Sequence, residues 1–450
     1  MRVEINTRYW IPRLAYNAGK HLAVIMSLLR KTLLYETLVQ NGGKMVPFAG
    51  WLMPIQFDGT SVLESVRHTR RHASLFDVSH MLQCRFSPNS LESLMPVDTK
   101  TMRVGAAQYT AILNEQGGII DDAILTKRES NYTLVSNASR VNAVLALLSD
   151  NVSVCENALF ALQGTVRLLC GLLSEHQATS LLFMNSLESA EFTITRCGYT
   201  GEDGFEISVK PEAAPSMAEL LLKDARVKLA GLAARDILRL EAGLCLYGHD
   251  VDETVTPIEA GLQWIISKSR KDYPGFDRLS MQMRMGVTKK RLGFTSPEGP
   301  LPREGAVITE LENGSVVGKI TSGTFSPHTN SNISMGYVNA DSVEGLKSLA
   351  NSTSLAVQIR GKQYPISALF KAIPTAALRV PRVTSLPTLL LRQPIRIGLR
   401  VKETLSGREL TVGRMEMERG GVRARVWSTT GGEISEREMW GGKWRIADAK

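Results

Sequence analysis

The stretch that decides the fold is Leu113-Asn114-Glu115-Gln116-Gly117-Gly118-Ile119-Ile120-Asp121-Asp122-Ala123-Ile124-Leu125. Its apolar residues predict a strand, and Gly117-Gly118 predicts the tight turn before it. Two adjacent carboxylates inside such a strand need an explanation, because burying an ionised group is costly unless it is paired or protonated. Successive strand residues point to opposite faces, so only one acid can face a pocket. On this segment alone, a hairpin with an edge acid near its turn is the simpler interpretation.

Length and composition describe an ordinary globular protein. The chain has 450 residues, enough for two to four domains, and 43% of them are apolar while 22% are charged. The net charge of +9 is concentrated at the two ends, since residues 1–31 carry six Lys and Arg against one Glu, and residues 376–450 carry fifteen against eight acids. The body between them is slightly acidic. This distribution argues against a nucleic-acid enzyme.

The cysteines and histidines indicate no metal site. The five cysteines are scattered without a Cys-x-x-Cys pair, which favours free thiols in a reducing compartment over a zinc cage. His68 and His72 have helical spacing, but two arginines lie between them and no Glu accompanies them. We therefore expect no bound metal.

The N-terminal stretch has the composition of a targeting segment. No apolar run reaches the roughly 18 residues that a membrane span needs, and the longest candidate is Leu22–Leu29. Residues 1–31 are basic, poor in acids and interleaved with Ile, Trp, Leu and Tyr, which predicts a mitochondrial presequence. A disordered basic tail or wrongly assigned upstream translation are the alternatives.

Periodicity along the chain predicts a mixture of helices and strands. Helices are expected at Ser61–His72, Ala213–Leu222 and Ala230–Gly243. From Arg291 onward, short strands with Gly and Pro turns predict a small β-barrel or sandwich. These strands are Leu292–Thr295, Ala306–Ile308, Val316–Thr321, Ile333–Val338 and Leu355–Ile359. The last 75 residues are Arg-rich without clean periodicity, and their structure stays open.

Two further segments present charged side chains on regular elements. In the predicted strand Phe205–Val209, the apolar residues share one face and leave Glu206 on the other. In the predicted helix, Arg235 and Arg239 lie one turn apart on a shared face. A solvent-facing strand acid and a salt-bridged helix surface explain these patterns equally well without a ligand.

Taken together and in order, several motifs resemble the glycine cleavage T-protein family, the tetrahydrofolate-dependent aminomethyltransferases. The resemblance runs from about Arg30 to about Thr375. It implies an α+β fold of three domains in a cloverleaf with a C-terminal β-barrel, followed by an unrelated C-terminal extension. The implied division is 1–31 presequence, 32–286 folate-binding aminomethyltransferase domains, 287–375 barrel and 376–450 basic extension. The motifs are Phe48-Ala49-Gly50-Trp51, Leu75-Phe76-Asp77-Val78-Ser79-His80-Met81, Gly117–Asp122, Arg196–Gly204 and Leu232-Ala233-Ala234-Arg235-Asp236.

The resemblance also implies a site and partners. Asp122 corresponds to the catalytic aspartate of the family, and Glu206 and Arg235 to contacts with folate or substrate. Tetrahydrofolate is expected as the acceptor substrate, the lipoyl-bearing H-protein as the donor, and the P- and L-proteins as members of the same system. A monomer in the mitochondrial matrix is expected. The other residues expected at the folate site are Met81, Tyr109, Tyr132, Val135, Asn137 and Tyr199.

One departure from the family concerns the end of the catalytic region. An aromatic pair normally follows the Pro-Thr that stands here as Pro374-Thr375, whereas Ala376 follows in this chain. The remaining seventy residues are either a real extension or a gene-model artefact. Two alternative functions stay open: a folate-dependent demethylating module, although no Gly-x-Gly-x-x-Gly follows a strand, and a non-catalytic folate-binding relative, although its Lys-Gly-Cys-Tyr-like segment is absent.

Overall fold

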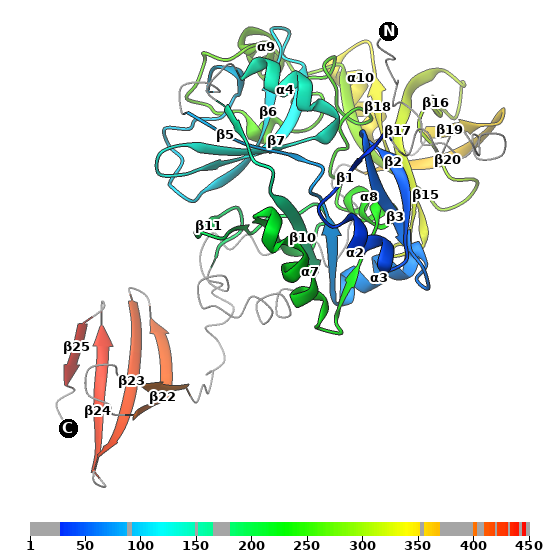
Figure 1. Ribbon diagram of the computed structural model, residues 1–450. Helices are drawn as coiled ribbons and strands as arrows, with labels where there is room; N and C mark the ends of the chain where they lie inside the picture. Colours follow the sequence, from blue (N-terminus) through cyan, green and yellow to red (C-terminus); the bar gives the residue numbers. More distant parts are fainter. Residues whose placement is uncertain are drawn as a thin grey trace. The chain divides into compact units, whose positions relative to one another are not determined.

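The computed structural model describes residues 28–87, 92–148, 152–164, 181–351 and 355–369, together with the backbone of five strands between 399 and 446. The chain divides into two compact units, residues 1–380 and 381–450 (Figure 1). The first unit combines helices with sheets and ends in a closed barrel, as the α+β prediction required. None of the described helices is long and apolar enough to cross a membrane.

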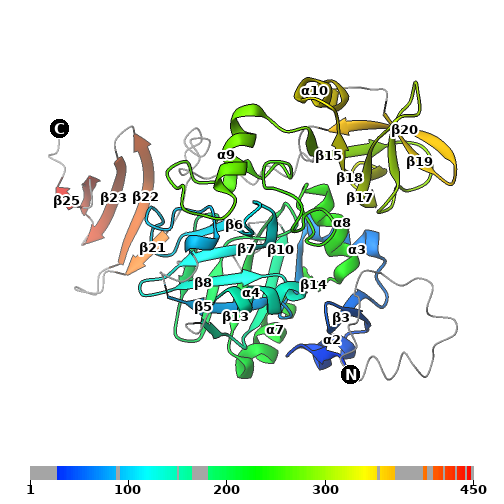
Figure 2. The same ribbon diagram turned by 90° about the horizontal axis from the view of Figure 1, so that it is seen from above.

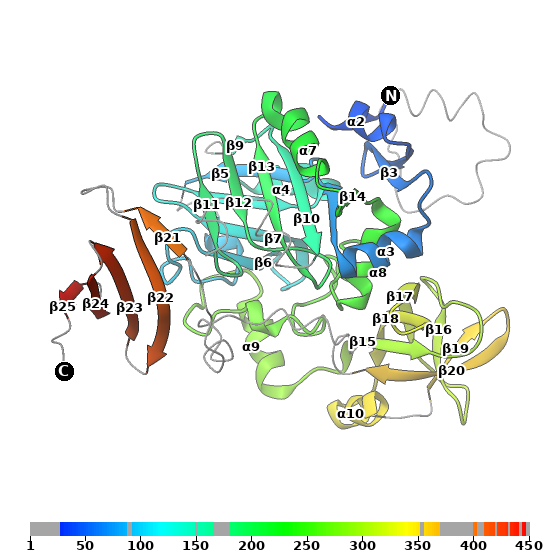
Figure 3. The ribbon, with the colours of Figure 1, turned by 90° about the horizontal axis from the view of Figure 1, so that it is seen from below.

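Two sheets build the part of the first unit that holds the acidic pair. Their strands lie in two layers in Figure 3, and the chain passes from one sheet to the other after β4 and returns at β10. The six-stranded sheet has the order β11(Ser186–Glu188)-β12(Phe192–Thr195)-β13(Asp203–Val209)-β10(Ala158–Gly164)-β4(Ala73–Asp77)-β14(Val227–Leu229). The five-stranded sheet has the order β6(Ala107–Leu113)-β7(Ile119–Lys127)-β8(Tyr132–Ser136)-β5(Leu82–Phe86)-β9(Val152–Val154).

A small N-terminal sheet and short helices surround these layers. Helix α3 agrees with its predicted range, because Ser61 and Glu64 form a capping box at its start and Arg70 and Arg71 favour its C-terminal end. The sheet has the order β1(Arg30–Lys31)-β3(Trp51–Phe57)-β2(Gly43–Phe48). The α-helices are α2(Tyr35–Gln40), α3(Val62–Arg71), α4(Val141–Leu147), α7(Ala214–Leu222), α8(Leu232–Glu241), α9(Phe276–Met285) and α10(Val343–Asn351). The 3-10 turns are η1(Glu92–Leu94), η2(Ala138–Arg140), η4(Pro211–Ala213) and η5(Gln263–Ile265).

The predicted barrel is confirmed. Alternate residues of its strands, among them Leu292, Phe294 and Ile320, meet in an apolar interior. Each of the five predicted strands is present, and a sixth strand, β20, closes the barrel. The order is β15(Lys289–Ser296)-β18(Ser331–Asn339)-β17(Val316–Ser326)-β16(Val307–Glu310)-β19(Leu355–Ile359)-β20(Lys362–Leu369).

Helix α8 connects the two-sheet region to the barrel (Figure 2). Arg239 is only 2% exposed; its guanidinium lies 2.5 Å from Asp250 and 2.9 Å from the Ser322 hydroxyl of β17. The interpretation of Arg239 as part of a salt-bridged helix surface is therefore wrong. The residue is a buried link between α8 and the barrel, because the barrel covers that side of the helix.

The second unit contains an antiparallel five-stranded sheet with strands in sequence order. Its strands are β21(Leu399–Lys402), β22(Glu409–Glu418), β23(Gly421–Thr430), β24(Glu433–Trp440) and β25(Lys443–Ile446). The predicted end of the catalytic region at Thr375 lies outside the described residues, as does most of the predicted presequence. The domain boundaries near residues 32, 287 and 376 stay predictions.

Candidate functional site

The acidic pair lies on β7, in the middle of three consecutive antiparallel strands. The turn before it is tight: Gly117 has a φ of 72° and its N–H donates to the Asn114 carbonyl at 2.8 Å, while a Cβ on Gly118 would stand 1.8 Å from the Glu253 carbonyl oxygen. Alternation then separates the acids as predicted: Asp121 is 0% exposed, whereas Asp122 is half-buried. Asp122 is thus the acid whose side chain remains accessible.

Two neighbours orient the Asp122 carboxylate. The Tyr109 hydroxyl donates a hydrogen bond to it at 3.0 Å, and the Asn137 side-chain amide donates another at 2.9 Å. The same Asn137 amide donates to Asp121 at 2.7 Å, and the Asn137 backbone N–H donates to Asp121 at 3.1 Å. The two acids therefore share one amide although their side chains leave opposite faces of the strand.

Burial and mutual repulsion raise the pKa of this pair. The pKa of Asp121 rises to about 7, chiefly through burial and then through the charge of Asp122. Burial also raises the pKa of Asp122, but the hydrogen bonds from Tyr109 and Asn137 oppose that rise. The two carboxyl groups therefore titrate as a coupled pair, at higher pH than isolated aspartates.

Glu206 projects from the facing sheet. Phe205, Ile207 and Val209 of β13 are buried in an apolar cluster, so Glu206 and Ser208 point the other way and are half-buried. Burial raises the pKa of Glu206, whereas the charge of Arg235 and a hydrogen bond from Cys197 lower it. The predicted presentation of Glu206 away from the core is confirmed.

Arg235 and Tyr199 join the two sides of the site. The Arg235 guanidinium lies over the Tyr199 ring at 4.5 Å from its centroid, and Arg235 Nη1 is buried without a hydrogen-bond acceptor among the described residues. The Tyr199 hydroxyl donates to the Cys245 carbonyl. Burial raises the pKa of Tyr199, the charges of Arg239 and Arg235 lower it, and the charge of Asp122 raises it. Asp122, Tyr199, Arg235 and Glu206 therefore form one electrostatic neighbourhood.

An open cleft with a volume of about 50 Å³ lies between the two sheets. Ile124 and Val135 line it from the five-stranded sheet, and Glu206 and Ser208 line it from the six-stranded sheet. Met81 and Val135 both pack against a neighbouring apolar cluster and are half-buried. The lining of the cleft is mixed: apolar side chains such as Ile124, Val135 and Leu159 lie beside polar groups such as Gln83 and Asn157, a combination that can hold and orient a flat heterocycle.

One predicted site residue lies elsewhere. Tyr132 is 4% exposed and stacks on Phe86 in the core of the five-stranded sheet, with 5.8 Å between ring centroids. Its neighbour Thr133 lines the cleft instead. The prediction for Tyr132 is wrong because alternation along β8 sends Tyr132 and Val135 to opposite faces.

Sequence reasoning also missed Trp264. Its side chain is 62% exposed and its ring stacks on Tyr109 at 5.6 Å between centroids, so it supports the hydroxyl that holds Asp122. An isolated aromatic residue in a 3-10 turn carries no sequence signal for this role.

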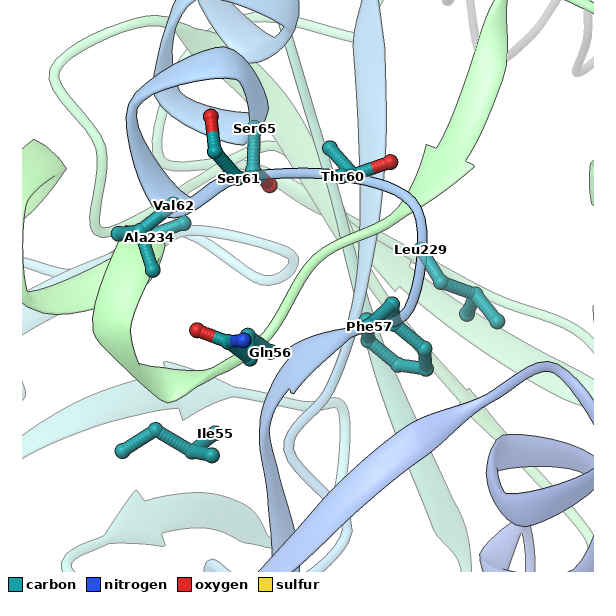
Figure 4. Close-up of a pocket in the computed structure, with 10 residues that line it drawn as sticks. Ile55, Gln56, Phe57, Thr60, Ser61, Val62, Ser65, Leu229 and Ala234 are labelled. Carbon is teal, nitrogen blue, oxygen red and sulfur yellow. The ribbon is translucent and has the colours of Figure 1, made fainter.

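A second, smaller pocket lies at the start of α3 (Figure 4). It is lined by Gln56, Ser61 and Ala234, among others, and its volume is about 10 Å³. The Ser61 hydroxyl accepts from the Glu64 N–H at 3.2 Å and the Glu64 carboxylate accepts from the Ser61 N–H at 2.9 Å. These bonds satisfy the helix end, and the pocket adds no reactive group to the site.

Comparison with known proteins identifies similar chains over most of the first unit. The family model "GCVT N-terminal domain" matches residues 34–270, and "Glycine cleavage T-protein C-terminal barrel domain" matches residues 289–372. Mitochondrial aminomethyltransferase of Mus musculus is 41% identical over 373 residues, covering 77% of this chain and 90% of the mouse protein. The protein of that name from Homo sapiens is 40% identical over 370 residues, covering 76% of this chain and 89% of the human protein. The crystal structure of glycine cleavage system aminomethyltransferase T from Bartonella henselae superposes with a TM-score of 0.69 at 37% identity, covering 76% of this chain and 96% of that one.

Proposed function

The chain belongs to the glycine cleavage T-protein family, and we propose that Asp122, Glu206 and Arg235 form the site at which it transfers an aminomethyl group to tetrahydrofolate. It is an aminomethyltransferase, like the relatives it matches. The reaction takes the methylene of an aminomethyl group from a lipoyl arm, releases ammonia and forms 5,10-methylene-tetrahydrofolate. The observation that carries the site is the half-buried Asp122 carboxylate, held by Tyr109 and Asn137 beside the cleft.

Asp122 acts on the charge that develops during transfer. The methylene passes through an iminium-like cation, which a nearby carboxylate stabilises more strongly in a partly desolvated site than in water. Tyr109 and Asn137 both donate to Asp122, which favours its ionised form and orients the carboxylate. Asp122, the acid with the accessible side chain, supplies the negative charge, and a proton shared within the pair keeps it from carrying two charges.

Glu206 and Arg235 fix the acceptor. A pterin edge presents two adjacent N–H donors, and the carboxylate of Glu206 can accept both in a charge-assisted pair. Strand β13 holds Glu206 rigidly because its neighbours Phe205 and Ile207 are buried. The unpartnered Nη1 of Arg235 is available for an anionic or carbonyl group of the substrate.

We assign the donor protein, the oligomeric state and the location by analogy with the family. The partner is the lipoyl-bearing H-protein, with the P- and L-proteins acting in the same system, and the protein works as a monomer in the mitochondrial matrix. Mitochondrial relatives and the basic composition of residues 1–31 support the location. The catalytic unit comprises residues 32–286 and the barrel 287–375.

Turnover with purified components tests the function. The full chain is incubated with H-protein carrying the aminomethyl-lipoyl group, and ammonia and 5,10-methylene-tetrahydrofolate are measured with and without tetrahydrofolate. We expect folate-dependent release of both products, reduced roughly 10²-fold or more by Asp122→Asn and retained by the control Asp224→Asn, whose carboxylate is paired with Arg226 away from the cleft. Tight folate binding without turnover would identify a non-catalytic relative instead.

A further inference from the structure

The cleft that Glu206 lines also reaches a cluster of charged residues. Asp122, Ile124, Thr126 and Arg128 follow one another on the same side of β7 and its end. At about 3.4 Å per residue, Arg128 lies about 20 Å along the strand from Asp122. Arg85 of β5 lines the same part of the cleft. We call Arg85, Arg128 and Glu188 the arginine end of the cleft.

The arginine end has more positive than negative charge. Arg128 is 8% exposed, and its Nε–H is buried with no hydrogen-bond acceptor among the described residues. The nearest carboxylate oxygen is Glu188 Oε2 at 3.5 Å. The other oxygen of Glu188 accepts from Arg85 Nη2 at 2.6 Å. One carboxylate therefore serves two guanidinium groups and satisfies only Arg85 with a hydrogen bond.

A buried guanidinium with an unsatisfied N–H is costly to keep unless something binds it. Burial lowers the pKa of Arg128, Glu188 opposes that change, and Arg85 adds to it by repulsion. A second anion placed between the two arginines would relieve both the missing hydrogen bond and the repulsion. The hydroxyls of Thr126 and Thr133, which line the same cleft, add neutral donors.

We propose that the arginine end is a binding site for a carboxylate group, held by Arg128 and Arg85. The planar fork of a guanidinium matches the two oxygens of a carboxylate in a bidentate pair. The carboxylate can belong to a free small acid or to the glutamyl tail of a folate. Only the second source rests on the proposed function.

Titration of the full chain with sodium acetate at constant ionic strength tests the site, with the line width of the acetate methyl signal as the readout. We expect saturable binding that weakens about tenfold or more in Arg128→Gln, because a charge-assisted bidentate pair is lost. Glu188→Gln should bind acetate more tightly, since the competing carboxylate is removed. Arg226→Gln is the matched control: it removes one arginine charge at an exposed position paired with Asp224 and should leave binding unchanged.

A second measurement identifies the source of the carboxylate. Dissociation constants of tetrahydrofolate and of tetrahydropteroate, which lacks the glutamate, are compared in the wild type and in Arg128→Gln. A loss confined to tetrahydrofolate assigns the site to the glutamyl tail; equal affinities together with Arg128-dependent acetate binding assign it to a free acid.

The site is refuted if acetate binding and the preference for tetrahydrofolate over tetrahydropteroate are the same in Arg128→Gln and the wild type. Because Glu188→Gln changes affinity in the opposite direction, a misfolded Arg128 variant cannot imitate the full pattern. If aminomethyl turnover is normal but Arg128→Gln changes neither acetate binding nor the preference for tetrahydrofolate, the carboxylate site is refuted and the proposed function stands. If the protein shows no aminomethyl turnover but binds acetate in a way that depends on Arg128, the proposed function is refuted and the carboxylate site stands.

Discussion

Replacement of Asp121 by Asn should remove a pH dependence of stability that the acidic pair imposes. The pKa of Asp121 is about 7 in the folded protein, against an ordinary value of 3.8. Between these values the folded chain holds a proton that the unfolded chain has released, so stability falls as pH rises and levels off above pH 7. At 1.36 kcal/mol per pH unit, the wild type should lose at most about 3 kcal/mol between pH 5 and pH 7 on this account. Asp121→Asn should lose much less.

Urea unfolding of the full chain at pH 5, 6, 7 and 8, followed by tryptophan fluorescence, measures this difference. Asp98→Asn is the matched control, because a hydrogen bond from Ser269 holds the pKa of Asp98 below its ordinary value and the group stays ionised across the whole range. Its pH dependence should equal that of the wild type. An equal pH slope in Asp121→Asn would show that Asp121 does not hold the proton.

Activity of the same variants tests which acid faces the substrate. Asp122→Asn should reduce turnover roughly 10²-fold or more, the scale of a lost acid–base or charge-stabilising group. Asp121→Asn should retain turnover within about tenfold, because its side chain is 0% exposed and acts only through Asp122. Equal losses in both variants would contradict the assignment of roles from alternation along β7.

Three further predictions concern the folate site and the chain end. Glu206→Gln should weaken tetrahydrofolate binding about tenfold or more, because a charge-assisted acceptor is worth roughly 1.5–3 kcal/mol, whereas early melting with normal binding would make Glu206 structural. Tyr109→Phe should move the acidic limb of the pH–rate profile upward, since Asp122 loses a donor that lowers its pKa, and an unmoved limb would contradict that hydrogen bond. Limited proteolysis between residues 376 and 398 should leave an active first unit, because residues 381–450 form a compact unit of their own. Addition of Tyr-Tyr after Thr375, with a stop soon afterwards, should raise activity. Loss of the fold on cleavage, or no gain from the repair, would show that the extension belongs to the folded catalytic unit.

Local sequence patterns predicted the elements whose apolar faces are simple. Helix α3 has its capping box, and β13 alternates cleanly, so the position of Glu206 followed from the sequence. Strand β20 was missed because its exposed and buried residues alternate weakly around Pro365. The resemblance to a family supplied the roles, and the strand geometry then decided which residues can fill them.

What the sequence could not supply depends on contacts between distant segments. Tyr132 was assigned to the site, yet one position along β8 decides between cleft and core. Asn137 was expected near the pterin. Its hydrogen bonds to both Asp121 and Asp122 depend on the turn after β8 lying next to β7, a contact that the local sequence does not reveal. The roles of Trp264 and Arg128 depend on where η5 and the end of β7 lie in the fold. Trp264 stacks on Tyr109, and Arg128 lines the cleft.

The buried link from α8 to the barrel limits how this protein can be recombined with its relatives. A chimera that joins the first 286 residues of this chain to a foreign barrel would keep Arg239 and Asp250 but replace Ser322, the hydroxyl that Arg239 reaches at 2.9 Å. Losing this hydrogen bond to a buried charged group costs roughly 1.5–3 kcal/mol. The same helix carries Arg235, so strain from a mismatched barrel would reach the substrate site. Successful exchange therefore requires α8, the Asp250 loop and β17 to be transferred as one block.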